Sequence, residues 1–161
     1  PNMRHRRAVF YVNKEFFVLV DEGIGSAAGS ANLSFNLCRY ESEVEYDANE
    51  MGAHTTFTDN NIVVRTFTNE TATFNEMEGR VAYVVKNDVF DKRKAYQIKI
   101  NKLANKTARF ITVIYPCKKT EGQTIEAVFT DNGYSANGAS IKVTINGIEY
   151  PLSYILQSNN F

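Results

Sequence analysis

The sequence has 161 residues, of which 43% are hydrophobic and 12% aromatic, and its 18 basic and 18 acidic side chains give a formal net charge of zero. This composition excludes a disordered or fibrous chain, and the length is sufficient for one folded domain with its own core. The balanced charge gives no general attraction to nucleic acid or to a membrane surface, and the apolar runs are far shorter than the roughly 20 residues that a membrane-spanning helix needs. We therefore expect a single domain over residues 1–161.

The apolar residues follow a period of two along most of the chain, which is typical of β-strands with one buried face. The predicted strands are residues 8–13, 15–21, 31–38, 53–58, 61–67, 80–86, 94–100, 108–115, 124–130, 140–146 and 148–156. Asn13-Lys14 and Asn146-Gly147 each separate two of these runs, so a tight hairpin is expected at both places. Pro151 cannot donate a backbone hydrogen bond to a neighbouring strand, so the last run is expected at a sheet edge or a bulge.

Helical periodicity is weak along the whole sequence. The best candidate, residues 86–94, is short and polar, and residues 23–31 and 130–140 are expected to be loops because they are rich in glycine and small polar residues. Many short strands separated by turns predict an all-β domain with the architecture of an antiparallel β-sandwich.

The acidic run at residues 41–50 contains five carboxylates and no basic residue. It lacks the Asp-x-Asp-x-Asp-Gly spacing of a calcium loop, so we expect a solvated edge strand whose charges discourage pairing with another chain. Cys38 and Cys117 lie far apart and belong to no Cys/His cluster, so no metal site is predicted. The two cysteines could pair in an oxidising compartment, but free thiols are the expected state.

Three arginines surround one of the two histidines at the amino end, in Arg4-His5-Arg6-Arg7. Guanidinium groups match carboxylate and sulfate oxygens, and a histidine can exchange a proton near neutral pH. The cluster could line a groove for an anionic ligand, or it could be the solvated start of a strand. Because side chains alternate across a strand, Arg7 is expected on the same face as His5, and Arg6 on the other.

The second histidine, His54, opens a threonine-rich strand. A polar histidine at the surface or at the edge of the core is the expected reading, and contact with a substrate is the alternative. The patterns GxSxG, GxxxxGK[ST], HExxH and GxGxxG are all absent. A serine or cysteine nucleophile would also need a base within reach, so a complete catalytic site and a cofactor are not expected in this chain.

The stretch HRRAVFYVNKEFFVLVDE at residues 5–22 resembles a strand pair that opens on His-x-Arg in the carboxy-terminal β-sandwich of the heparinase II/III-type polysaccharide lyases. GAHTTFTDNNIVVRTF (52–67), ARFITVIYPCK (108–118) and INGIEYPLSYIL (145–156) are most similar to the heparinase III branch, the heparan-sulfate lyases. The resemblance extends over nearly the whole chain.

This resemblance implies that an amino-terminal α/α toroid packs on the sandwich and that an acidic polysaccharide binds in the cleft between them. It implies cleavage by β-elimination, in which the uronate carboxylate is neutralised, a base removes the C5 proton and an acid assists the leaving oxygen. The family's toroid residues and its His-x-His-x-Asp motif are absent here, so the central catalytic groups are expected before Pro1. By the same resemblance His5 is the catalytic candidate that faces the cleft. Arg4, Arg6 and Arg7 are candidates for uronate or sulfate contacts, and Arg7 is favoured over Arg6.

Two other functions stay open on the sequence alone. The first is a stand-alone carbohydrate-binding sandwich that stacks sugars on some of its tyrosines, although Tyr11, Tyr83 and Tyr115 are expected in the core. The second is a structural or adhesion domain. Pro1 is an unusual first residue, so we expect a processed chain or a part of a longer protein; a bacterial periplasmic or secreted location follows from the resemblance alone.

Overall fold

The computed structural model describes residues 2–37, 43–81 and 91–156. In these residues antiparallel strands dominate, and the one short helix, η2, is a single 3-10 turn (Ala48–Glu50). The strands are β1 (Arg4–Val12), β2 (Phe16–Ile24), β3 (Gly29–Asn36), β4 (Val44–Asp47), β5 (Gly52–Thr55), β6 (Asn61–Phe67), β7 (Ala72–Val81), β8 (Asp91–Lys102), β9 (Ala108–Cys117), β10 (Ile125–Phe129), β11 (Gly138–Ile145) and β12 (Ile148–Ile155).

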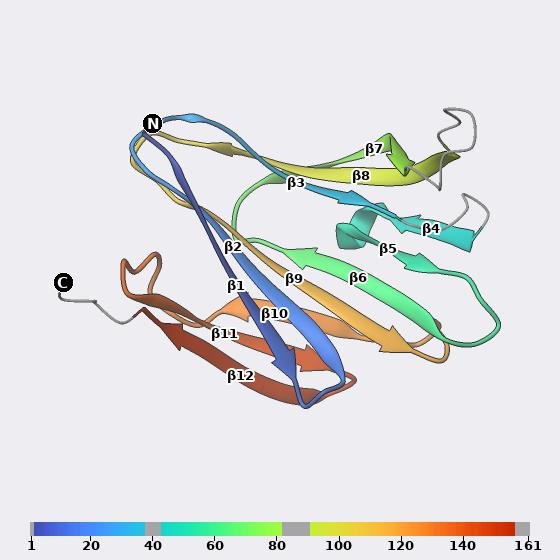
Figure 1. Cartoon of the computed structure of the whole chain (residues 1–161). Coiled ribbons are helices and arrows are strands. Elements are labelled where there is room, and N and C mark those ends of the chain that lie inside the picture. The colour runs from blue at the N-terminus through green and yellow to red at the C-terminus, as the bar shows by residue number, and fades with distance from the viewer. Residues whose placement is uncertain (1, 38–42, 82–90, 157–161) are drawn as a thin grey trace.

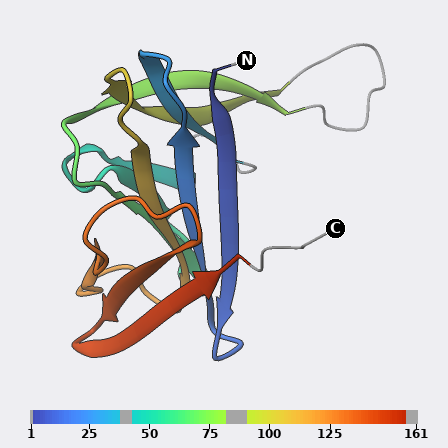
Figure 2. The same cartoon turned by 90° about the vertical axis from the view of Figure 1, so that its left-hand side faces the viewer.

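The strands form three sheets. The largest has six strands in the order β1-β2-β9-β6-β5-β4, and two three-stranded sheets have the orders β10-β11-β12 and β3-β8-β7. Strands β1 and β2 run from the β3-β8-β7 sheet at one end of the molecule to the β10-β11-β12 sheet at the other (Figures 1 and 2). These facing antiparallel sheets confirm the predicted all-β sandwich.

Two hydrophobic cores hold the three sheets together. The larger core lies between the six-stranded sheet and β10-β11-β12, and its buried side chains include Phe16, Val18, Ile111 and Val143. The smaller core lies between the other face of the six-stranded sheet and β3-β8-β7, and it is centred on the buried ring of Tyr96. The six-stranded sheet therefore has one face covered by β10-β11-β12 and the other covered only in part.

The two predicted hairpins are both present. Asn146 and Gly147 link β11 to β12 with φ angles of 50° and 82°, which is the left-handed backbone that a two-residue hairpin turn requires. Between β1 and β2 the loop has three residues, with Asn13 and Lys14 in the left-handed region and Glu15 donating its amide hydrogen to the Val12 carbonyl. This loop fixes which residues of β1 and β2 face each other.

Most predicted strands are present within a few residues of their expected bounds. Residues 44–47 form an edge strand as expected, and the strand with Pro151 is the edge of its sheet. The predicted loop at 23–31 was too long, because β2 continues to Ile24 and β3 begins at Gly29. The prediction also missed most of β7, and residues 82–90, which include most of the predicted strand 80–86 and of the helix candidate 86–94, lie outside the described residues.

Tyr11 corrects an expectation for the core: its side chain is exposed, whereas Tyr115 packs against the larger core. Tyr83 and Cys38 lie outside the described residues. Cys117, at the end of β9, is partly buried, and this burial raises the pKa of its thiol. In the described ranges no helix has the length and apolar character to cross a membrane.

Candidate functional site

His5 and Arg7 meet at one carboxylate, that of Asp21 on the neighbouring strand. The His5 Nε2 atom lies 2.5 Å from Asp21 Oδ1, and the Arg7 Nε atom donates to the same oxygen at 2.7 Å. The Asp21 side chain is only 3% exposed, whereas that of His5 is 60% exposed. A buried carboxylate therefore holds two basic side chains that remain open to solvent.

The register of the first hairpin produces this arrangement. Arg7 pairs with Asp21 across β1 and β2, and His5 pairs with Gly23. Because side chains alternate along each strand, His5, Arg7, Asp21 and Gly23 share one face of the sheet. Gly23 has no side chain, and a Cβ atom there would meet Ala31 and Ala108 at ordinary van der Waals distances.

A groove of about 560 Å³ opens on this face. Arg4, His5, Arg7 and Asp21 form one wall, and the exposed strand β3 forms the other with Ser30, Asn32 and Ser34. This volume lies within the range of small-ligand sites. The groove combines three cationic or ionisable basic groups, one carboxylate and several neutral polar groups, which suits a ligand that carries both an anionic group and hydroxyl groups.

The start of β3 is held in place by a buried lysine. Lys102 Nζ donates to the Gly25 carbonyl at 2.7 Å and also to the Ala27 carbonyl. Gly25 has a φ of +136°, and a Cβ atom there would collide with the backbone of Asn2, so the chain end packs closely on this loop. The loop that leads into the β3 wall is therefore fixed from both sides.

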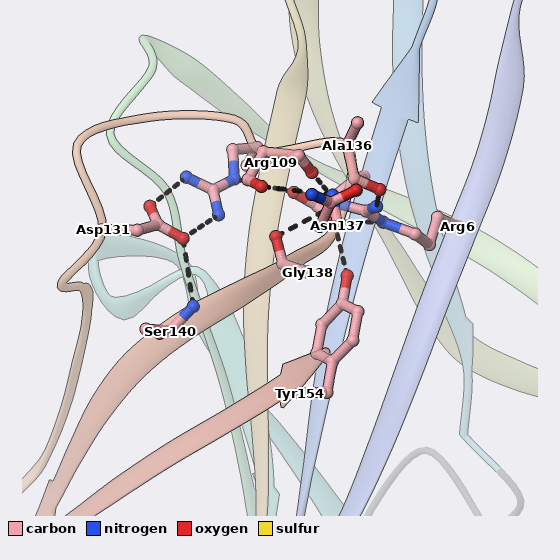
Figure 3. Close-up of polar contacts among 10 residues, drawn as sticks. Arg6, Arg109, Asp131, Ala136, Asn137, Gly138, Ser140 and Tyr154 are labelled. Atoms are coloured by element: carbon pink, nitrogen blue, oxygen red, sulfur yellow. Dashed lines mark hydrogen bonds and ion pairs between the residues drawn. The ribbon is translucent and has the colours of Figure 1, made fainter. Parts of the chain in front are cut away.

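Arg6 points to the opposite face, as strand alternation predicts, and belongs to a different cluster. It donates through Nε to Glu22 Oε2 at 2.7 Å and also to the carbonyls of Ser135 and Ala136 (Figure 3). Glu22 is fully buried and also accepts hydrogen bonds from Arg109 and from the Tyr154 hydroxyl. The guanidinium of Arg6 is thus bound inside the fold and away from the groove, and its candidate role as a substrate contact stays a prediction.

Arg109 extends this cluster to Asp131 through two hydrogen bonds of 2.7 and 2.8 Å (Figure 3). The hydrogen bond from Arg109 lowers the pKa of Asp131. Burial, together with the hydrogen bond to Glu22, raises the pKa of Tyr154. The cluster of Arg6, Glu22, Arg109, Asp131 and Tyr154, called the buried clasp below, ties the six-stranded sheet to β10-β11-β12.

His54 lies away from the groove. It is on β5, with three strands between β5 and β1 in the sheet order, and the register places it on the opposite face from His5. Its Nδ1 atom lies 2.8 Å from Asp47 Oδ2, and Arg65 lies beside the same carboxylate. In the structure His54 is a partner of Asp47 outside this groove, and its candidate role as a substrate contact stays a prediction.

Asp21 and Glu22 were not identified as functional candidates from the sequence. The available signal was their position at the end of β2, directly opposite the basic cluster in a predicted hairpin. Pairing Arg7 with Asp21 required the length of the loop between β1 and β2, since a two-residue turn would have paired Arg6 with Asp21. In the described part of the chain no group of three or more His, Cys, Asp and Glu side chains is placed to hold a metal ion.

An exposed apolar area lies on the same face of the sheet, further along β1 and β2. Val9 is 60% exposed, and the rings of Tyr11 and Phe17 stack with their centroids 4.6 Å apart. The cross-strand register continues this area through Leu19, Ile62, Val64, Ile114 and Pro116. These eight residues are called the apolar face below, and they begin directly beside Arg7. Leu19, Val64 and Ile114 are half-buried, and Ile62, Val64 and Ile114 line a hollow together with Phe35 and Leu37 at the end of β3, so the β3-β8-β7 sheet leaves this face only partly open.

Comparison with models of known protein families shows to which family the chain belongs. The model of the heparinase II/III-like C-terminal domain matches residues 1–97. The chain belongs to the heparinase II/III family. It is 53% identical over 158 residues to a heparin-sulfate lyase of Bacteroides thetaiotaomicron and 28% identical over 149 residues to a heparin-sulfate lyase of Pedobacter heparinus.

Solved structures of the heparinase II/III family have the same fold. A crystal structure of heparinase III matches 96% of this chain with a TM-score of 0.92 at 53% identity. The heparan sulfate lyase HepC from Pedobacter heparinus matches the whole chain with a TM-score of 0.85 at 26% identity. The chain spans 22% of the length of the two curated relatives and about a quarter of these two solved chains.

Proposed function

We propose that this chain is the carboxy-terminal sandwich portion of a longer heparan-sulfate lyase and that its groove lines the path of the polysaccharide. The single observation that carries the proposal is the pair of exposed basic side chains, His5 and Arg7, fixed on Asp21 beside a partly open apolar face. The family membership and the names of the relatives supply the class of substrate.

The position of His5 suits proton transfer. A carboxylate oxygen can only accept a hydrogen bond, so the contact with Asp21 places a hydrogen on His5 Nε2. In the neutral ring Nδ1 is then the free base, and it belongs to a side chain that is mostly open to solvent. In β-elimination such a group would remove the uronate C5 proton or assist the leaving oxygen.

Arg7 and Arg4 would neutralise charge on the substrate. Arg7 is bound to Asp21 only through Nε, so its two terminal nitrogens remain for a carboxylate or a sulfate group. Arg4 lines the same groove and is exposed. Neutralising the uronate carboxylate makes the C5 proton more acidic, which is the main electrostatic requirement of the reaction.

The apolar face would be covered by the preceding part of the lyase. Large exposed apolar areas that adjoin polar residues are typical of surfaces that bind another protein surface. His5 and Arg7 would then lie at the edge of this contact, where a cleft between two domains would open. The groups that complete the reaction would come from the preceding part, so the chain alone would not cleave the polymer.

The location would be periplasmic or secreted, because a polymeric extracellular polysaccharide has to meet its lyase outside the cytoplasm. The alternative, a stand-alone carbohydrate-binding module, has weaker support. The exposed rings of Tyr11 and Phe17 stack on each other, so neither offers two free faces to a sugar.

The test is made in the full-length lyase, with His5→Ala and Arg7→Ala assayed on heparan sulfate by the absorbance of the unsaturated uronate product. We expect His5→Ala to lower kcat by roughly 10²–10⁴-fold, as for the loss of a general acid or base. Arg7→Ala should lower kcat/KM by about 10-fold, with most of the loss in kcat, because the charge-assisted hydrogen bond that neutralises the uronate carboxylate is lost.

Lys142→Ala is the matched control, since it removes an exposed cation from the β10-β11-β12 sheet, and it should change neither constant. Thermal melts of all three variants separate loss of chemistry from loss of folding. Full activity of both groove variants would make the amino end an ordinary solvated strand end and reject the proposal.

A further inference from the structure

The Asp21 carboxylate has one oxygen whose role is unexplained. Oδ1 binds both His5 and Arg7, whereas Oδ2 is buried and has no hydrogen-bond partner. An unpaired buried carboxylate oxygen is costly, and native proteins usually satisfy such an atom with a side chain, a water or a ligand. Oδ2 has almost no accessible surface, so a ligand in the groove that Asp21 lines reaches this atom only with a shift of the exposed His5 or Arg7 side chain.

The chemistry of this oxygen is opposite to that of its neighbours. Arg4, His5 and Arg7 attract an anion, but a carboxylate oxygen repels one and accepts only from a donor such as a hydroxyl or amide hydrogen. The binding of a bare anion such as sulfate is favoured by the arginines and disfavoured by the negative charge of Asp21. A sugar acid gains from both, because it carries an anionic group and free hydroxyl groups on one ring.

We propose that Asp21 is a specificity residue: its free Oδ2 accepts a hydrogen bond from a hydroxyl or amide group of an acidic sugar, while Arg7 and Arg4 bind the anionic group of the same sugar unit. This inference rests on the proposed function and deepens it, since it names the ligand feature that the groove selects. The groove thereby distinguishes a hydroxylated acid from a simple anion of similar charge.

Asp21→Asn tests this with two probes in the full-length lyase. The amide has nearly the shape of the carboxylate and keeps one oxygen for His5 and Arg7, but it has no negative charge. The probes are the unsulfated unsaturated disaccharide of heparan sulfate and inorganic sulfate, with binding followed by calorimetry or by NMR titration. Only the binding component that Arg7→Ala removes is counted as belonging to the groove.

We expect opposite signs for the two probes. Asp21→Asn should weaken the binding of the disaccharide by about 10-fold, as expected for the loss of one hydrogen bond to a charged acceptor. The same substitution should leave sulfate binding unchanged or strengthen it, because a negative charge is removed from the groove. If Asp21 only positioned His5 and Arg7, the substitution would weaken the binding of both probes.

The possible results separate this inference from the proposed function. Parallel weakening of both probes, or no change in either, would overturn the role of Asp21 as a specificity residue. So would the absence of any groove binding by the wild-type protein. If His5→Ala and Arg7→Ala still lose cleavage in those cases, the proposed function stands without this role; if they cleave normally, both fail.

Discussion

Glu22 joins residues that come from three distant parts of the chain. Its carboxylate is fully buried, with Arg6 of β1 and Arg109 of β9 within the same sheet and Tyr154 of β12 from the facing sheet. The Glu22 charge offsets the two guanidinium charges in part, and Asp131 supplies the rest. Glu22 therefore connects two sheets and, together with Asp131, neutralises a buried cluster.

Replacing Glu22 with alanine should strongly destabilise the fold. Both guanidinium groups would lose their shared partner in a poorly hydrated site, which typically costs roughly 3–5 kcal/mol in the free energy of unfolding. Urea denaturation followed by circular dichroism measures this change.

Glu149→Ala is the matched control, because it removes a carboxylate from the exposed pair with Lys142. Exposed pairs contribute about 0–1 kcal/mol, so this variant should unfold at nearly the wild-type urea concentration. Equal losses for the two glutamates would contradict a structural role for the buried clasp.

The faces of individual side chains could be predicted from the sequence, but their partners could not. Alternation along β1 was enough to place Arg7 with His5 and to send Arg6 to the other face. The partners depend on register, and the three-residue loop at 13–15 shifts that register by one relative to a two-residue turn. His54 shows the same limit, because its separation from His5 follows from a strand order that local patterns do not encode.

The loop between β10 and β11 is attached to the six-stranded sheet through Asp131. This carboxylate binds Arg109 of β9 with both oxygens and also accepts from the backbone amide of Ser140 in β11. The hydrogen bond from Arg109 holds the pKa of Asp131 below its ordinary value of 3.8. The attachment of this loop therefore depends on a charged carboxylate.

The lowered pKa of Asp131 predicts a stability loss in acid. The unfolded chain binds a proton at Asp131 near pH 3.8, but the folded chain binds it only at lower pH, so the contribution is complete above this range and is lost as pH falls through the folded pKa. We expect Asp131→Asn to melt at a lower temperature than the wild type at about pH 6, with the difference shrinking towards about pH 2.5. Melting temperatures across this range measure the effect.

Asp59→Asn, in the exposed turn between β5 and β6, should leave the difference from wild type small at every pH. A constant gap between the Asp131→Asn and wild-type melting curves would show that the pKa of Asp131 does not contribute to the acid dependence.

The local sequence predicted the strands that pack on a core, but it did not predict a strand that is mostly exposed to solvent. Strands β6, β9 and β11 have alternating or continuous apolar residues, and their predicted positions hold to within about two residues. Strand β7 was missed over most of its length because only its first part touches the core, through Ala72 and Phe74, whereas Glu76, Met77 and Glu78 are exposed. A mostly solvated strand has no strong period to detect.

The coverage of the central sheet is unequal on the scale of the whole molecule. One face packs against β10-β11-β12, whereas the other carries the β3-β8-β7 sheet over one part (Figure 1) and the partly open apolar face over the rest. The sequence predicted a sandwich but not which part of the sheet is exposed, since apolar and polar residues alternate along the strands of the apolar face as they do in strands that pack on a core. Tyr11 was placed in the core for that reason.

This partly open face makes a prediction that compares two lengths of the protein. Ile62 is 42% exposed in the present chain, and it would become buried if another part of the proposed lyase packs on the apolar face. Ile62→Thr should then change the unfolding free energy of residues 1–161 by only about 0.5 kcal/mol, but that of the full-length protein by roughly 1.5–3 kcal/mol.

Ile148→Thr makes the same chemical change at a residue that is 60% exposed on β12, and it should have a small effect in both proteins. Denaturation of the four variants beside the two parents distinguishes the cases: a loss for Ile62→Thr confined to the longer protein identifies a buried interface, whereas equal small losses in both lengths would mean that the apolar face stays open to solvent.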